Sequence, residues 1–151
     1  MPNENFYQTI ENMQEIATTI RTFVRFSEVD ALKMVWHGNY VRYMEDAREA
    51  FGIEHGLAYV DMFQNGYLAP VVDIHLQYKH SATINDVLRT TIKYHHCRGG
   101  KLMFDYRMLR ETDNVEILTA TSIQLFTTID GVLEVSCPEF LQQWRLKHNL
   151  L

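Results

Sequence analysis

The spacing of apolar side chains changes along the chain, and each spacing predicts a different element. From Thr19, the segment TIRTFVRFSE places Ile20, Val24 and Phe26 on one parity, which is typical of a strand. After the next loop, apolar side chains recur at steps of three and four residues: Tyr40, Val41, Tyr43, Met44, Ala47 and Phe51. This spacing predicts an amphipathic helix from His37 to Phe51, about 22 Å long. Gly52 should end its strongest part.

The rest of the chain alternates with a period of two, which predicts strands. In VVDIHLQYK, Val72, Ile74, Leu76 and Tyr78 share one face, and polar residues take the other. Polar turns separate this run from VLRTTIKYHHC, KLMFDYRMLRE and VEILTATSIQLFTT, and Asp130-Gly131 suits a hairpin turn. Short turns between alternating runs predict an antiparallel meander, which one long helix would cover. The expected fold class is therefore α+β.

The chain length allows one domain. Its 151 residues can enclose one core but are too few for two ordinary domains. We expect an N-terminal extension over residues 1–18, in which Phe6, Ile10 and Met13 have helical spacing, and a domain over residues 19–151.

Composition and charge narrow the classes of function. The net charge is −5 and there is no dense basic run, which argues against nucleic acid as a partner. The two cysteines, Cys97 and Cys137, form no CxxC motif, which favours reduced thiols. No apolar run has the length of a membrane span, and the first residues lack the order of a signal peptide. We expect a cytoplasmic protein without a membrane span.

The stretch DALKMVWHGNY brings an acid and a histidine to the start of the predicted helix. Unpaired backbone N–H groups at a helix start can stabilise negative charge on a carbonyl oxygen. Asp30 could act there as general base or nucleophile, and His37 could donate a hydrogen bond. The alternative is a helix cap and a chance Asp–His pair, although Asp30 is far upstream for a cap.

The run from Phe26 to Arg48 resembles the signature of the 4-hydroxybenzoyl-CoA thioesterase family, which has the hotdog fold and includes the Tol–Pal-associated thioesterases. The matching residues are Asp30, Val35, Trp36, His37, Asn39, Tyr40, Glu45, Ala47 and Arg48. The likeness covers about residues 19–138. It implies an antiparallel sheet wrapped around one helix, and hydrolysis of an acyl-CoA thioester without metal or cofactor.

The resemblance also implies roles for single residues. Asp30 would be the catalytic carboxylate, and the backbone N–H of His37 would face the thioester oxygen while its side chain assists. Substrate contacts would come from Val35, Trp36, Gly38 and Tyr40. Leu32-Lys33 departs from the family, which often has Gly in this loop, and could narrow the pocket or bring Lys33 to the substrate.

Several other residues have weaker claims. Lys79, Arg98 and Lys101 lie in or near turns where they could meet the phosphates of CoA. Glu45 and Arg48, three apart on the helix, predict an ordinary ion pair, with a minor catalytic claim for Glu45. His95, His96 and Cys97 lack the further ligands that a metal site needs, so no metal site is expected.

Two other classes of function stay open from the sequence. One is a hotdog hydratase or dehydratase that acts on an acyl thioester, and the other is a non-catalytic binder of acyl thioesters. The resemblance implies a homodimer joined edge to edge through its sheets, or a tetramer built from two such dimers. It does not identify the acyl group.

Overall fold

The structure of the chain is a computed structural model that describes residues 15–150. The helix expected around Phe6, Ile10 and Met13 lies outside these residues. In chain order the described elements are β1 (Ala17–Phe23), η1 (Phe26–Glu28), α2 (Asn39–His55), α3 (Tyr59–Gln64), β2 (Tyr67–Leu68), β3 (Val71–Tyr78), β4 (Val87–His95), β5 (Lys101–Arg110), β6 (Glu116–Thr128), β7 (Leu133–Glu134) and α4 (Glu139–Lys147).

An antiparallel sheet forms one layer, with the order β1-β4-β5-β6 and β3 on the other side of β6. The predicted meander is confirmed for β4, β5 and β6, which pair in succession. It is wrong for β3, which pairs with β6 rather than with β4. The reason is that β1 occupies the edge of β4 that β3 would need. The short strands β2 and β7 also pair with β6.

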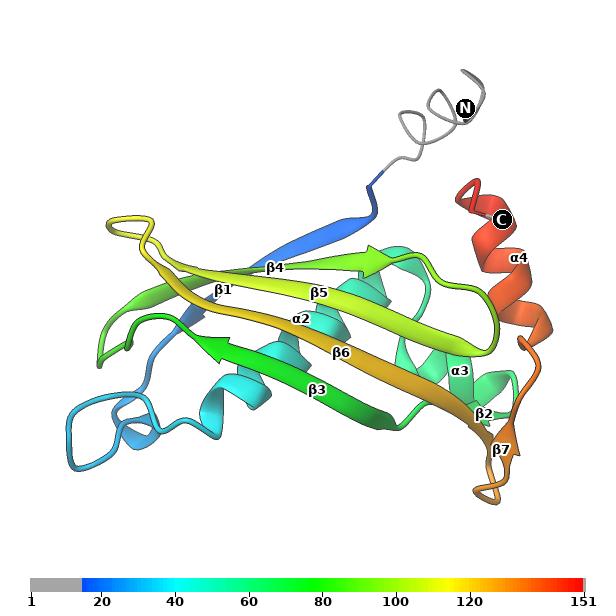
Figure 1. Ribbon diagram of the computed structural model, residues 1–151, viewed down its shortest axis with the longest axis horizontal. Helices are drawn as coiled ribbons and strands as arrows, with labels where there is room; N and C mark the ends of the chain where they lie inside the picture. The colour runs from blue at the N-terminus through cyan, green and yellow to red at the C-terminus, as the bar shows by residue number, and fades with distance from the viewer. Residues whose placement is uncertain (1–14, 151) are drawn as a thin grey trace, which may run out of the picture.

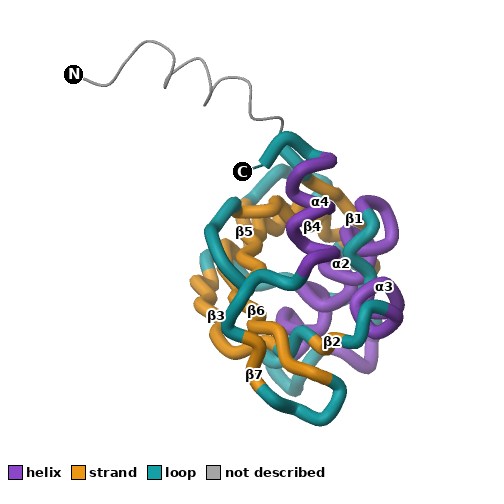
Figure 2. The backbone as a smooth tube through the Cα atoms, turned by 90° about the vertical axis from the view of Figure 1, so that its right-hand side faces the viewer, coloured by secondary structure: helices purple, strands orange, loops and turns teal. Residues whose placement is uncertain are grey.

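Helix α2 lies along one face of the sheet, and the sheet curves around it (Figures 1 and 2). Its predicted apolar face is confirmed, because Tyr40, Tyr43, Met44, Ala47 and Phe51 are all buried. Side chains from β4, β5 and β6 complete the core, among them Leu88, Ile92, Leu102, Met108 and Leu118. The expected α+β class and the hotdog arrangement are both present.

The end of α2 differs from the prediction. The helix continues through Gly52 to His55, and Gly56 ends it with a left-handed backbone, at φ 79°. Gly52 serves packing instead, because a Cβ there would lie 2.7 Å from the backbone oxygen of Leu57. A side chain at position 52 would therefore push against the backbone of the following turn.

Three further elements also differ. β1 starts at Ala17, inside the expected extension, and ends at Phe23, so the single strand expected over residues 19–28 is wrong at both ends. Its second part forms the 3-10 turn η1. The segment between α2 and β2 contains α3, which the sequence did not predict, and the C-terminal part expected as strand contains α4.

The apolar side chains at alternate positions of β3 face the helix side of the sheet, but other parts of the chain cover them poorly. Ile74 lies opposite Ser122 and Leu76 opposite Ala120, and both partners are buried. Ile74 is nevertheless 37% exposed and Tyr78 49% exposed. β3 pairs only with β6 among the described strands, so its second edge is open.

Candidate active site

A tight loop holds Asp30 between β1 and α2. An antiparallel bridge between Val29 and Val35 closes the loop. The Asp30 N–H donates to the Met34 carbonyl at 2.8 Å, and the Lys33 N–H donates to the Asp30 carbonyl at 2.9 Å. Asp30 thus belongs to a loop closed by its own hydrogen bonds. It does not follow a strand directly, contrary to the prediction, because β1 ends seven residues earlier.

The carboxylate of Asp30 has one oxygen fixed by its own loop. Its Oδ1 accepts a hydrogen bond from the Leu32 N–H at 2.8 Å, an Asx turn. No described residue donates to Oδ2, and the side chain is part-exposed. This geometry orients the carboxylate while leaving one oxygen able to accept a proton.

Leu32 and Lys33 occupy the place where the family often has glycine. Lys33 has φ 63°, a left-handed conformation that glycine would take at less cost. Leu32 is 72% exposed, and neither side chain lines the cavity described below. The departure from the family therefore leaves the loop conformation intact and does not narrow this cavity.

Trp36 and Gly38 shape the start of α2. Gly38 is the N-cap, with helical angles of φ −70° and ψ −24°. A Cβ at this position would lie 2.1 Å from the Trp36 ring, so the ring packs over Gly38 because there is no side chain. The Trp36 N–H and the Asn39 side chain both donate to the Glu28 carbonyl, at 3.0 and 2.9 Å. These contacts fix the direction in which the chain enters the helix.

The backbone at His37 and Gly38 provides N–H groups that can stabilise an anion. Within residues 15–150, neither the His37 N–H nor the Gly38 N–H has a hydrogen-bond acceptor. The His37 carbonyl accepts a hydrogen bond from the Tyr78 hydroxyl at 3.0 Å. Two amides at the start of a 17-residue helix can thus donate to an incoming oxygen.

A cavity of about 290 Å³ joins these groups. Among the predicted site residues, Asp30, Val35, His37, Tyr40 and Lys79 line it. Sequence reasoning missed four other lining residues: Met34, Tyr78, His80 and Ser81. The sequence pattern places Tyr78 on the apolar face of a strand, and its position at the end of that strand, beside Lys79, is the signal that indicates the site.

Tyr40 forms a buried wall of the cavity. Its hydroxyl accepts a hydrogen bond from the Ala82 N–H at 3.1 Å, and its ring lies 5.4 Å from that of Tyr78. Burial raises the pKa of Tyr40 above its usual value, so the phenol stays neutral. Tyr40 therefore acts as a rigid wall rather than as a base.

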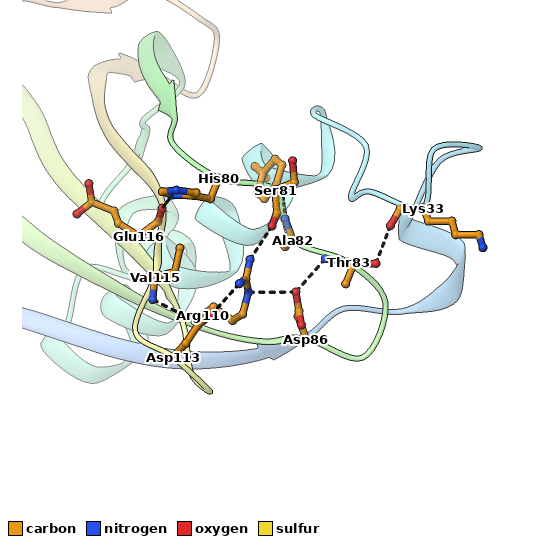
Figure 3. A network of polar contacts seen from close by, with 11 residues as sticks. Lys33, His80, Ser81, Ala82, Thr83, Asp86, Arg110, Asp113, Val115 and Glu116 are labelled. Carbon is orange, nitrogen blue, oxygen red and sulfur yellow. Dashed lines mark hydrogen bonds and ion pairs between the residues drawn. The ribbon is translucent and has the colours of Figure 1, made fainter.

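A polar network holds the segment around Ser81, which lines the cavity (Figure 3). Arg110 donates to the Ser81 carbonyl at 2.9 Å and pairs with Asp86 at 3.4 Å. Thr83 donates from its hydroxyl to the Lys33 carbonyl at 2.6 Å, which ties this turn to the Asp30 loop. Arg110 is too far along the chain to be suspected from the local motif, yet its hydrogen bond supports the Ser81 segment.

The other predicted site residues lie elsewhere. Trp36 and Gly38 shape the helix start but do not line the cavity. Arg98 lies in the turn between β4 and β5, and Lys101 begins β5, at the opposite end of the sheet from the loop that precedes α2 (Figure 1). Within one chain, the structure does not bring these two cations to Asp30.

The remaining candidates have ordinary partners. Arg48 donates to the Tyr106 hydroxyl at 3.2 Å, and no ion pair with Glu45 is present in the described part of the chain, so that predicted pair is wrong. His95 pairs with Asp105 at 2.8 Å. β4 ends at His95, so His96 and Cys97 lie in the turn that follows this strand. Residues 15–150 contain no group of three potential metal ligands.

The matching region of the chain identifies its family. Residues 24–145 match the model of the thioesterase-like superfamily. The chain belongs to this superfamily. The match begins just after β1 and ends in α4, so it includes the Asp30 loop, α2 and the whole meander.

Relatives of this superfamily member agree with the assignment. The chain is 33% identical over 101 residues, 66% of its own length and 72% of the relative's, to the Bacillus subtilis protein YneP, whose name proposes an acyl-CoA thioesterase. A Thermus thermophilus protein of unassigned function is 27% identical, with 84% and 95% of the two chains covered and a TM-score of 0.75.

A further structure supports the fold alone. The DHNA-CoA thioesterase from Staphylococcus aureus is 20% identical, with 88% of this chain and 89% of that chain covered and a TM-score of 0.79. The hotdog fold is therefore confirmed. Within residues 15–150, no helix is long and apolar enough to cross a membrane.

Proposed function

We propose that the protein hydrolyses an acyl-CoA thioester to a carboxylic acid and free CoA. The observation that carries this proposal is the cavity in which the Asp30 carboxylate meets the start of α2 at His37. Membership of the thioesterase-like superfamily and the likeness to YneP support the same chemistry. A carboxylate that lines one cavity with unpaired amides suits attack on a carbonyl carbon better than it suits passive binding.

Asp30 supplies the base or the nucleophile. Its Oδ2 either takes a proton from an attacking water, or attacks the thioester carbonyl to form an anhydride that water then hydrolyses to the acid and free Asp30. The Leu32 N–H, which donates to Oδ1, holds the carboxylate in a fixed direction during either step. CoA leaves as a thiolate, which needs little help from an acid because thiols ionise readily.

The start of α2 stabilises the tetrahedral state. The thioester oxygen gains negative charge there, and the His37 N–H is the donor proposed for it. One such donor lowers the activation barrier by about 3 kcal/mol. The Tyr78 hydroxyl donates to the His37 carbonyl, which shares a peptide group with the Gly38 N–H, so it polarises and orients this second amide. The exposed His37 side chain can assist through a hydrogen bond or a proton transfer.

The proposed active form is a homodimer, or a tetramer of two dimers, joined through β3. The open edge of β3 offers backbone groups to a second copy, and Ile74 and Tyr78 would lose their exposure there. Tyr78 also lines the cavity, so this contact would reach the site. Light scattering should give at least twice the 17.8 kDa of one chain, and a purely monomeric species would refute the dimer.

A panel of acyl-CoAs tests the reaction class. Release of free thiol should appear with at least one thioester, together with an equimolar carboxylic acid. Water addition to an enoyl-CoA without thiol release would reassign the protein as a hydratase. Tight binding of thioesters with no turnover across the panel would make it a binder and refute hydrolysis.

A further inference from the structure

Helix α4 carries a buried arginine whose partners are all neutral. Arg145 is 6% exposed. Its guanidinium donates to the Tyr94 hydroxyl at 3.0 Å, to the Gly99 carbonyl at 2.8 Å, to the Lys101 carbonyl at 3.0 Å and to the Cys137 sulfur at 3.3 Å. These bonds tie α4 to the turn between β4 and β5.

The charge of Arg145 is left uncompensated by the described residues. Among residues 15–150, no carboxylate lies within ion-pair distance of its guanidinium. Burying a cation is costly unless an anion accompanies it. The neighbouring residues add positive charge, because Arg98 and Lys101 lie in or beside the same turn and Lys147 lies in the last turn of α4. A chain with net charge −5 thus concentrates cations at this one place.

The hydrogen bonds of Arg145 satisfy its three guanidinium nitrogens but not its charge. Nε, Nη1 and Nη2 each donate to at least one neutral acceptor. The positive charge beside the cavity is therefore the feature that an anionic ligand would compensate.

A cavity of about 230 Å³ adjoins this guanidinium. Arg145 and Arg98 provide charge on its lining, Gln142 provides an amide, and Leu146 and Leu150 provide apolar surface. At about 30 Å³ for each water in the liquid, the space equals roughly eight waters. It can hold a tetrahedral oxyanion together with a small organic group bonded to it.

We propose that this cavity binds a phosphate monoester dianion between the guanidinium groups of Arg145 and Arg98. A dianion neutralises both cations, whereas a single carboxylate leaves one charge. Guanidinium groups match phosphate oxygens in geometry and need not lose a proton. The apolar side of the cavity would contact the organic part of the ester. This site is distinct from the Asp30 cavity, which lies at the other end of the sheet.

Inorganic phosphate is the first probe, titrated at constant ionic strength. The melting temperature of the intact protein should rise and saturate, and the amide NMR signals of Gly99 and Lys101 should shift with the same midpoint. Arg98→Gln, at an exposed position, should weaken binding about tenfold. Arg107→Gln, which removes the same charge from the sheet surface, should leave binding unchanged. Arg145→Gln should abolish it, with circular dichroism checking the fold.

Two further ligands identify the source of the phosphate. CoA that competes with inorganic phosphate, while dephospho-CoA does not, would assign the 3′-phosphate of CoA as the ligand. Failure of both to compete would assign a phosphate ester other than CoA. The proposal is overturned if phosphate binding does not saturate, or if Arg98→Gln binds phosphate as tightly as the Arg107→Gln control and the wild type do. Either result is independent of whether thioesters are hydrolysed.

Discussion

Gly38→Ala perturbs the start of α2 at the point where Trp36 packs on it. The backbone angles, φ −70° and ψ −24°, are helical and suit alanine. On backbone grounds alone, alanine would stabilise the protein by about 0.4–1 kcal/mol. The new Cβ, however, would lie 2.1 to 2.8 Å from three atoms of the Trp36 ring, so the ring must leave its place.

The cost follows from the surface that Trp36 buries. Trp36 is 50% exposed, so about half of its surface is covered. A buried aromatic side chain removes about 150–250 Å² from water, which gives about 100 Å² for this half. At about 25 cal/mol per Å², its displacement costs about 2.5 kcal/mol. After the backbone gain, Gly38→Ala should lower the free energy of unfolding by about 1.5–2 kcal/mol.

A double-mutant cycle in urea measures this effect. In a Trp36→Ala background there is no ring to displace, so Gly38→Ala should be stabilising by about 0.4–1 kcal/mol. The coupling energy between the two positions should be about 2.5 kcal/mol. An equal loss of stability from Gly38→Ala in both backgrounds would refute the steric explanation.

Two further predictions concern the core. Gly52→Ala should destabilise the protein by about 1–3 kcal/mol in urea denaturation, because its Cβ would meet the Leu57 carbonyl oxygen at 2.7 Å. Glu49→Ala, on the exposed side of the same helix, is the control. A Gly52→Ala protein as stable as the wild type would contradict the packing. Burial raises the pKa values of Tyr43 and Tyr94, so the unfolded chain loses these phenol protons near pH 10 while the folded protein keeps them. Stability should therefore fall as the pH rises above 10. The fall should be shallower in Tyr94→Phe, and identical slopes would contradict the burial of that phenol.

Local patterns predicted the elements whose side chains alternate or repeat strongly. The three- and four-residue spacing of Tyr40, Met44 and Ala47 marked α2, and strict alternation marked β4, β5 and β6. α3 has six residues, too few for a clear period. In α4, the charged Arg145 occupies a buried position and so interrupts the apolar pattern that would predict a helix. The pairing of β3 with β6 is a long-range choice, and nothing local in β3 encodes it.

The candidate site was predictable where one short segment builds it. Asp30 and His37 line one cavity because a closed loop joins Asp30 to the helix start. Tyr78 and His80 arrive from the end of β3, whose position depends on that long-range pairing. Residue type and position in a turn predicted Arg98 and Lys101 as phosphate contacts. These two features do not reveal at which end of the sheet a turn lies.

The most direct measurement of the central claim is thiol release by Asp30→Asn beside the wild type. Asparagine keeps the side-chain oxygen that accepts the Leu32 N–H, so folding and assembly should be preserved. It removes the base or nucleophile, so kcat/KM should fall by about 10²–10⁴-fold. Asp130→Asn, the same change in the exposed turn before β7, should keep full activity. Unchanged turnover in a folded Asp30→Asn protein would contradict the account.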